Sequence, residues 1–261
     1  MGGAPIAPRA LALLNDTADG GVLSLVRCSS MDEDDVRFKI AAGRRILYRE
    51  GCDSNIGGHV SARAADGEDA FWVTGFEYFD QTTPDSVVKL GFDLEPREGQ
   101  MSFSPAVNFH ARIYQLRPDV NGIVHVHSHY VSVLSSLQQI VGMYNVGAVL
   151  FYQDQAMYFD DGHRPHVDVA DALGEKRVVF IKNHGAIIAS DSVENATIEA
   201  VMLEQSAHYH LECSAMGGTE ILEDEVLGGR TMYQKFFLPN MWQANVARLR
   251  RSDPDLFTWL D

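Results

Sequence analysis

Hydrophobic and polar residues alternate most regularly over Asn121–Tyr130, and this period of two predicts a half-buried β-strand. Alternation places Val124 and Val126 on one apolar face. The opposite face carries Ile123 and three imidazoles, those of His125, His127 and His129. Apolar runs that begin or end at glycine-containing turns predict further strands at the end of the stretch 52–63 and over residues 70–75, 176–181 and 186–189.

Apolar residues spaced by three and four positions predict helices, and capping residues indicate where these begin and end. An acidic run opens a helix expected over about residues 32–50. Ser104 is expected to be the N-cap, and Pro105 the first residue, of a helix that ends before Pro118. A shorter helix is expected over residues 130–137.

The longest helix is expected to begin at Asp191, with Glu194 as its capping-box partner, and to end before Gly217. Residues 142–151 form an apolar stretch with small side chains, which we interpret as a strand. Residues 152–158 and 162–166 are polar, aromatic and basic, and are expected to be loops over a site.

Composition supports one soluble domain: of 261 residues, 46% are apolar and 22% are charged. We expect residues 1–30 to form an N-terminal arm and residues 31–261 a single domain with an aromatic C-terminal tail. That tail is expected to be helical and to dock on the body or on a neighbouring subunit. No apolar run approaches the ~20 residues of a membrane span, so no membrane partner is expected.

Charge and cysteine content restrict the classes of binding partner and the cellular compartment that we expect. Lys and Arg number 21 and Asp and Glu 36, so the formal net charge is 21 − 36 = −15, which disfavours a nucleic-acid partner. An anionic small substrate remains compatible, because a metal ion and a few arginines reverse the local field. Three scattered cysteines, and no basic stretch followed by an apolar one at the amino terminus, predict a cytoplasmic protein without a signal peptide.

The candidate chemistry centres on His125 and His127, which alternate on one strand face and therefore lie close enough to bind one metal ion. The best third ligand is His184, where an apolar strand runs into an Asn-His-Gly turn. Three protein ligands with an open fourth position are typical of a catalytic metal. A His-x-His pair alone is weak evidence, since a half-buried strand also accommodates two hydrogen-bonded histidines.

Other polar residues have weaker claims to function. Backbone N–H groups at Gly57–Gly58 and Thr74–Gly75 are able to bind an anion, although paired glycines near hairpins more often serve turns. Loop residues His163 and His166 are more often without a role. Glu204 and His208 share a helix face and are conceivable ligands, but such a pair is usually a surface contact.

Several stretches together resemble the class II aldolase/adducin family: Gly-Gly-His-Val-Ser-Ala-Arg63, Thr74-Gly75, Arg117-Pro-Asp-Val-Asn121, Val124-His-Val-His127 and Lys182-Asn-His-Gly185. The resemblance covers roughly residues 35–215 and implies an α/β fold, a three-layer α/β/α arrangement with a mostly antiparallel central sheet. It also implies one divalent metal ion held by His125, His127 and His184. Homotetramers with active sites at subunit interfaces are typical of the family.

The chain departs from the family pattern at two places. Sugar-phosphate aldolases of the family have Ser-Ser-Glu, with the glutamate as acid and base, where this chain has Ser104-Pro105-Ala106. Their phosphate-binding Gly-Asn is replaced by Gly58-His59. Alanine cannot transfer a proton, so cleavage of sugar phosphates is disfavoured.

We therefore expect a metal-dependent carbon–carbon lyase, of decarboxylase or aldolase type, acting on a small oxygenated acid, with an aromatic substrate favoured. The metal is Zn, Mn or Fe(II), and His59 or His110 supplies the base that remains necessary. The expected substrate contacts are Gly57, Gly58, Thr74, Gly75, Ser104 and Tyr152, with Arg63 or Arg164 as further anion contacts. The alternatives are a non-haem Fe(II) oxygenase, like family members that act on aminocoumarin precursors, and a non-catalytic adducin-like scaffold.

Overall fold

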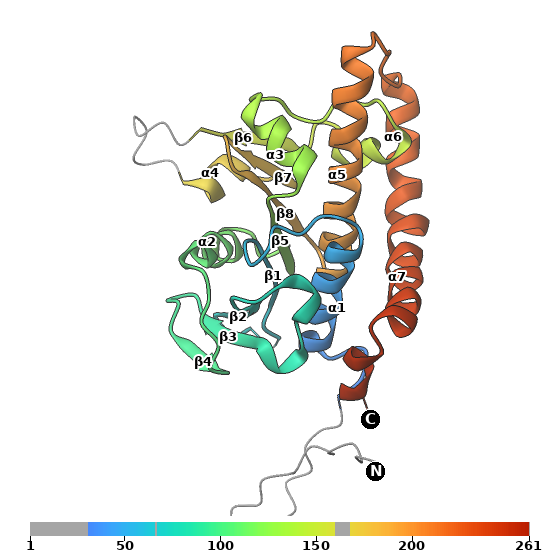
Figure 1. Ribbon diagram of the computed structural model, residues 1–261. Helices are drawn as coiled ribbons and strands as arrows, with labels where there is room; N and C mark the ends of the chain where they lie inside the picture. The colour runs from blue at the N-terminus through green and yellow to red at the C-terminus, as the bar shows by residue number, and fades with distance from the viewer. Residues whose placement is uncertain (1–30, 66, 160–167, 261) are drawn as a thin grey trace, which may run out of the picture. The chain divides into compact units, whose positions relative to one another are not determined.

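A central β-sheet organises the computed structural model, which describes residues 31–65, 67–159 and 168–260. Within these ranges the sheet has eight strands in the order β4-β3-β2-β1-β5-β8-β7-β6 (Figure 1). The strands are β1 (His59–Arg63), β2 (Ala70–Thr74), β3 (Val87–Gly91), β4 (Pro96–Glu98), β5 (Gly122–Val126), β6 (Gln155–Tyr158), β7 (Val178–Ile181) and β8 (Gly185–Ser190). Only the pair β6–β7 is parallel, so the expectation of a mostly antiparallel sheet is confirmed.

Helices cover both faces of the sheet and complete three layers (Figure 1). They are α1 (Val36–Arg49), α2 (Asn108–Leu116), α3 (His129–Ser136), α4 (Val169–Leu173), α5 (Val193–Ala215), α6 (Glu223–Met232) and α7 (Leu238–Ser252). Val124 and Val126 pack in the core under α1, α5 and α7, whereas Ile123 packs in the core under α2 and α4. The alternation predicted for this strand is therefore confirmed over Ile123–Val126, and α2 covers the face that carries His125. The placement of His129 on that strand face was wrong, because the strand ends at Val126 and His129 begins α3.

Local capping explains where α1 and the 3-10 turn before α2 begin. The Asp35 carboxylate accepts a hydrogen bond from the Arg37 N–H at the start of α1. The Ser104 hydroxyl accepts one from the Ala106 N–H, as expected of an N-cap. The first turn after Ser104 is a 3-10 helix, and α2 proper begins at Asn108.

Three expectations about local structure were wrong, and two strands were missed. Residues 142–151 contain no strand; Val146–Phe151 form a buried 3-10 helix, since a short apolar run does not distinguish the two conformations. The segment expected as a loop contains β6, which ends the sheet beside β7. The α5 N-cap is Ser192, which accepts from the Asn195 N–H, rather than Asp191. Strands β3 and β4 were not expected, because their residues lack a clean alternation.

The aromatic C-terminal tail is helical, as expected. Helix α7 packs against α5 and α1 and buries Trp242, Val246 and Leu249. Asp253, just after α7, accepts hydrogen bonds from the Arg49 guanidinium at 3.1 Å. In the described part of the chain, no helix is both long enough and apolar enough to cross a membrane. The proposed N-terminal arm, residues 1–30, lies outside the described residues.

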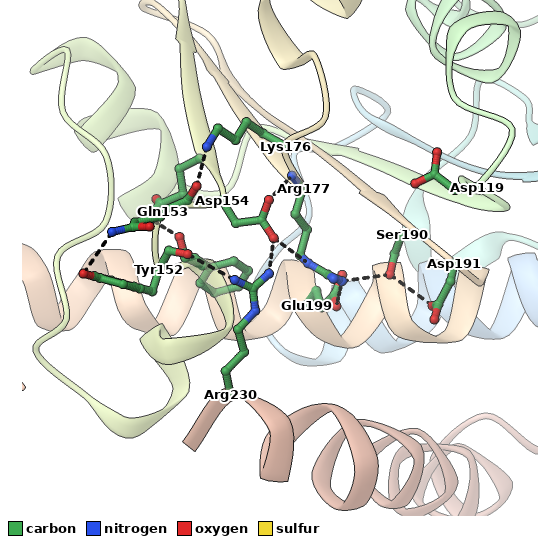
Figure 2. Close-up of polar contacts among 12 residues, drawn as sticks. Asp119, Tyr152, Gln153, Asp154, Lys176, Arg177, Ser190, Asp191, Glu199 and Arg230 are labelled. Carbon is green, nitrogen blue, oxygen red and sulfur yellow. Dashed lines mark hydrogen bonds and ion pairs between the residues drawn. The ribbon is translucent and has the colours of Figure 1, made fainter. Parts of the chain in front are cut away.

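A buried ion pair joins α5 to the strand ends at one edge of the sheet (Figure 2). Glu199 is fully buried and pairs with the Arg177 guanidinium, which also lies 3.5 Å from an Asp154 carboxylate oxygen. Burial raises the pKa of Glu199 to about 7, although the positive charge of Arg177 opposes that shift. Asp154 in turn pairs with Arg230 of α6, so the network ties three segments together.

Replacement of Glu199 by glutamine should weaken the dependence of stability on pH. The folded chain keeps a proton on Glu199 up to a pKa of about 7, whereas an unfolded glutamate releases it near 4.5. The stabilisation is therefore present below pH 4.5 and is lost as pH rises through 7, at up to about 1.4 kcal/mol per pH unit. Urea unfolding of both proteins at pH 5, 6, 7 and 8 measures the difference; parallel curves would contradict this assignment.

Candidate metal centre

Three imidazoles converge at the ends of β5 and β7. His125 is on β5, His127 follows that strand directly, and His184 lies in the turn between β7 and β8. The Nε2 atom of His127 lies 2.9 Å from Nε2 of His125 and 2.9 Å from Nε2 of His184. One ring nitrogen from each residue lies within 4.8 Å of the others, and among the described residues no Asp or Glu completes this group.

The backbone brings the third imidazole into place. Asn183 adopts φ 55°, a left-handed conformation that asparagine tolerates, so β7 turns tightly into β8. In the antiparallel register, Val126 pairs with Ala186, and the His184 turn therefore lies beside His127. A Cβ atom at Gly185 would lie 2.2 Å from the Val126 carbonyl oxygen, so only glycine permits this approach.

Hydrogen bonds at the outer nitrogens orient two of the rings. His125 Nδ1 lies 2.9 Å from the Ala186 carbonyl oxygen, which only accepts, so Nδ1 carries the proton. The Ser54 hydroxyl donates to the Gly57 carbonyl at 2.8 Å and therefore accepts from His127 Nδ1, 3.1 Å away. Both Nε2 atoms then direct lone pairs into the same small space, an arrangement that a cation stabilises.

The three rings are suited to remain neutral ligands. Burial lowers the pKa of His125 well below its usual value and that of His127 to about 4, with a further contribution from neighbouring imidazoles. Burial also lowers the pKa of His184, the most exposed of the three. Neutral imidazole is the form that binds Zn, Fe and related divalent ions, so the donor set fits such a metal.

A cleft of about 410 Å³ opens beside His127 and runs along α3. Its lining residues are His127, His129, Ser132, Val133, Ser136 and Leu137. Two larger hollows, of about 590 and 550 Å³, contain none of the three convergent histidines. The cleft at His127 is therefore the one we assign to a ligand of the metal centre.

Glu204 holds the start of α3 next to this cleft. Its carboxylate accepts from the Ser128 hydroxyl at 2.7 Å and from the backbone N–H groups of Tyr130 and Val131, both at 2.9 Å. Glu204 therefore caps α3. His208 stacks on Tyr130, with ring centroids 3.9 Å apart, and contacts Glu212. Neither residue joins the three convergent imidazoles. In the sequence, the indication of this role is that Glu204 is an acidic residue among the apolar positions of the long helix α5.

The two histidines expected as bases lie side by side behind the metal centre. His59 is the cross-strand partner of His125, and their ring centroids are 5.1 Å apart. His59 Nδ1 lies 3.1 Å from His110 Nε2. Burial lowers the pKa of His59 well below its usual value and that of His110 to about 3. His110 is fully buried, and its contact on the side of the metal centre is His59.

Most of the expected substrate contacts have structural roles near the centre. A Cβ at Gly58, where φ is +85°, would lie 2.6 Å from the His125 carbonyl oxygen, and one at Gly57 would lie 3.1 Å from His127 Nδ1. Thr74 is buried, with its hydroxyl 3.3 Å from the Val60 nitrogen, and the Gly75 carbonyl accepts from Arg44. These positions pack the loops around the imidazoles.

Two expected substrate contacts, Tyr152 and Arg63, have other roles in this chain. Strands β6 and β7 are parallel and begin side by side. Tyr152 lies just before the start of β6, whereas His184 lies just after the end of β7. Tyr152 thus lies at the opposite end of the strands, near Asp154 and Arg230 (Figure 2). The Arg63 guanidinium donates to backbone carbonyls. His163, Arg164 and His166 lie outside the described residues.

Ser54 was not expected, although it lies in the polar turn before Gly57, and it offers a direct test of ring orientation. Replacement of Ser54 by alanine should reduce metal affinity by about 10–100-fold, because the His127 ring loses the acceptor that fixes its tautomer. Competition with a chromophoric chelator measures the affinity. Alanine in place of Ser136, which lines the cleft and donates to the Ser132 carbonyl rather than to a ligand residue, provides the control. Equal affinities for all three proteins would contradict the assigned orientation.

Comparison with known proteins gives the same architecture and a set of related activities. Residues 38–211 match the family model described as the class II aldolase and adducin N-terminal domain. The chain is similar to the decarboxylase NovR of Streptomyces niveus, with 26% identity over 85% of this chain and 87% of that protein.

A second relative is 4-hydroxy-3-prenylphenylpyruvate oxygenase/4-hydroxy-3-prenylbenzoate synthase of Streptomyces roseochromogenus subsp. oscitans. It is 25% identical over 85% of this chain and 84% of its own length. L-fuculose 1-phosphate aldolase from Glaciozyma antarctica PI12 has a similar structure, with a TM-score of 0.74, 23% identity and coverage of 84% of this chain and 90% of that one. The fold expected from the sequence is thereby confirmed.

Proposed function

Since this chain belongs to the class II aldolase and adducin family, we propose that it is a metal-dependent carbon–carbon lyase that decarboxylates a small, oxygenated aromatic acid. The observation that carries the proposal is the convergence of His125, His127 and His184, which no carboxylate of the described residues joins. The relatives include decarboxylases and aldolases, which supports a lyase.

The residues around the cleft indicate which reaction remains available. A divalent ion bound by the three imidazoles would serve as a Lewis acid toward a carbonyl or carboxylate oxygen. The resemblance to the family implies that Ala106 stands where its aldolases have a proton-transferring glutamate, and the methyl group of alanine cannot move a proton. Loss of carbon dioxide requires no initial removal of a carbon-bound proton, so decarboxylation tolerates this substitution. The neutral ring of His59 lies next to His125 and is available to contact the acid.

An oxidative reaction is the second candidate. One relative is named as an oxygenase that acts on an aromatic 2-oxo acid. Three imidazoles hold Fe(II) as well as Zn(II) or Mn(II), so the same ligand set would serve either reaction. The scaffold alternative is less well supported, because the lone pairs of His125 Nε2 and His127 Nε2, 2.9 Å apart, would repel each other in a site that never holds a cation.

A substrate panel distinguishes these reactions. We expect carbon dioxide release from hydroxybenzoates, hydroxyphthalates or aromatic 2-oxo acids when the protein is supplied with Zn, Mn or Fe(II). Release that requires oxygen and Fe(II) would replace the lyase proposal with the oxygenase. Turnover of fuculose- or ribulose-type phosphates alone would contradict both, and no turnover with any metal would favour the scaffold.

We also propose that the protein is a homotetramer in solution, as is typical of the family. Large apolar side chains lie exposed at the end of α5, on α6 and after it, including Met216, Leu222 and Phe236. Burial of these side chains between copies would stabilise an oligomer. Sedimentation equilibrium at micromolar concentration tests this proposal, and a species of 28.9 kDa would overturn it.

A further inference from the structure

A chain of hydrogen bonds leads from Tyr114 on α2 to the ring next to the metal centre. The Tyr114 hydroxyl lies 2.8 Å from the Ser61 hydroxyl, which lies 2.6 Å from His110 Nδ1. His110 Nε2 then lies 3.1 Å from His59 Nδ1. All four side chains are buried, with exposed fractions of 4% for His59 and 1% or less for the others. Each of these three hydrogen bonds therefore shares one proton between two atoms that bulk water does not reach.

The direction in which these protons are donated follows from the far end of the chain. Within the described residues the Tyr114 hydroxyl has one hydrogen-bond partner, Ser61. A buried phenol that donated to nothing would lose a hydrogen bond, so Tyr114 donates to Ser61. Ser61 has a single proton and consequently donates it to His110 Nδ1. The reverse direction would leave the Tyr114 O–H without an acceptor.

The hydrogen bond between His110 and His59 extends this order of donors toward the metal centre. A neutral His110 that accepts at Nδ1 carries its proton on Nε2 and donates it to His59 Nδ1. His59 must then carry its own proton on Nε2, which has no hydrogen-bond partner among the described residues. Because His59 pairs with His125 across the β1–β5 ladder, this N–H is the end of the chain that lies nearest the metal ligands.

We propose that His59 contacts the substrate as a fixed N–H donor, directed at a carboxylate or carbonyl oxygen of an acid bound at the three convergent imidazoles. This inference rests on the proposed function for the identity of the acid, and it replaces the role of base that the sequence suggested for His59 and His110. A donor held in place before the reaction stabilises charge that develops on oxygen. Tyr114, Ser61 and His110 are positioning residues that fix the tautomer.

Nitrogen-15 NMR of the imidazoles tests the tautomer without any assay of activity. The full-length protein, labelled at histidine and measured both as isolated and with added zinc, should show His59 and His110 protonated at Nε2 and not at Nδ1. The His59→Gln and His110→Gln proteins assign the two signals by their loss. A proton on His59 Nδ1 would overturn the inference, whatever the substrate panel shows.

Replacement of Tyr114 by phenylalanine tests the far end of the chain. This variant removes the O–H that sets the direction, so the His59 and His110 signals should report a mixture of both tautomers. Thermal unfolding verifies that the variant is folded, and Ser61→Ala, which removes the donor to His110 Nδ1, provides a second variant should it not be. An unchanged single tautomer in a folded Tyr114→Phe protein would contradict the positioning role.

Ligand binding separates a donor from a base. With zinc-loaded protein and 2-hydroxybenzoate as the probe, calorimetry should show affinity about 10–100-fold lower for His59→Ala, the effect of losing a hydrogen bond to a charged group. His59→Gln keeps an N–H donor at a similar distance and should recover most of that loss. Equal loss in both variants, or no loss in either, would overturn the donor role. If the panel yields no turnover but the tautomers are as stated, only the proposed function fails.

Discussion

Replacement of His184 by alanine should remove most of the bound metal and abolish turnover while leaving the fold intact. Two imidazole ligands would remain. The loss of metal affinity should therefore exceed the roughly 10–100-fold loss that follows removal of a hydrogen-bond partner of a ligand. The fold should survive because His184 is exposed, in a turn whose Asn183 and Gly185 backbone is unchanged. Elemental analysis of protein purified without chelator, together with circular dichroism, measures both effects.

His208 provides the matched control for this experiment. It is another accessible histidine, but it stacks on Tyr130 and contacts Glu212 instead of joining the three imidazoles. The His208→Ala protein should therefore retain one metal ion per chain. Stoichiometric metal in the His184→Ala protein, or equal loss in both variants, would show that the ligand set is misassigned.

Replacement of Glu204 by alanine should destabilise the protein by about 3 kcal/mol and lower its metal affinity by at least about tenfold. The variant leaves three donors near the first turn of α3 without their acceptor: the Ser128 hydroxyl and the N–H groups of Tyr130 and Val131. Because Ser128 follows His127 directly, loss of this cap should also loosen the position of the metal ligand His127. Urea unfolding and chelator competition measure the two effects.

Glu212→Ala is the control for Glu204, because both residues are on α5 but Glu212 is exposed at the surface. Its free energy of unfolding should change by no more than about 0.5 kcal/mol. Glu204→Gln keeps one acceptor oxygen and should fall between the two. A Glu204→Ala protein as stable as the wild type would mean that α3 does not depend on this cap.

The three convergent histidines were predictable because each depends on local pattern. Alternation alone places His125 and His127 on the strand face opposite Val124 and Val126. The Asn-His-Gly sequence signals a tight turn after an apolar strand, which is where His184 lies. The pairing of β5 with β8, which places the His184 turn beside His127, was not predicted, because no local pattern determines which strands pair.

Other features were hidden because tertiary contacts decide them. The segment 142–151 is apolar enough for a strand, yet it forms a helical turn packed beside α5 and α6. Tyr152 has the chemistry of a substrate contact, but the parallel pairing of β6 with β7 places it at the far end of the strands. Ser54 and Glu204 act only through the rings and backbone that they hold, so their roles become visible once distances are known.

The sequence also does not determine which nitrogens of His59 and His110 carry protons. The resemblance to the family implied that His59 stands in place of an asparagine of the phosphate loop, and His59 was expected to supply a base. Only the contacts of His110, Ser61 and Tyr114 indicate that its free nitrogen carries a proton. The same residue type is therefore compatible with opposite roles, and its hydrogen-bond partners decide between them.

Reconstitution of metal-free protein tests the central claim most directly. Protein stripped with chelator should release no carbon dioxide from the best aromatic acid of the panel. As Zn, Mn or Fe(II) is added back, the rate should rise linearly and reach its maximum at one metal ion per chain, and the His184→Ala protein should not respond. Full activity in the stripped protein, or a rate that is independent of added metal, would contradict the assignment of His125, His127 and His184 as the metal centre of a lyase.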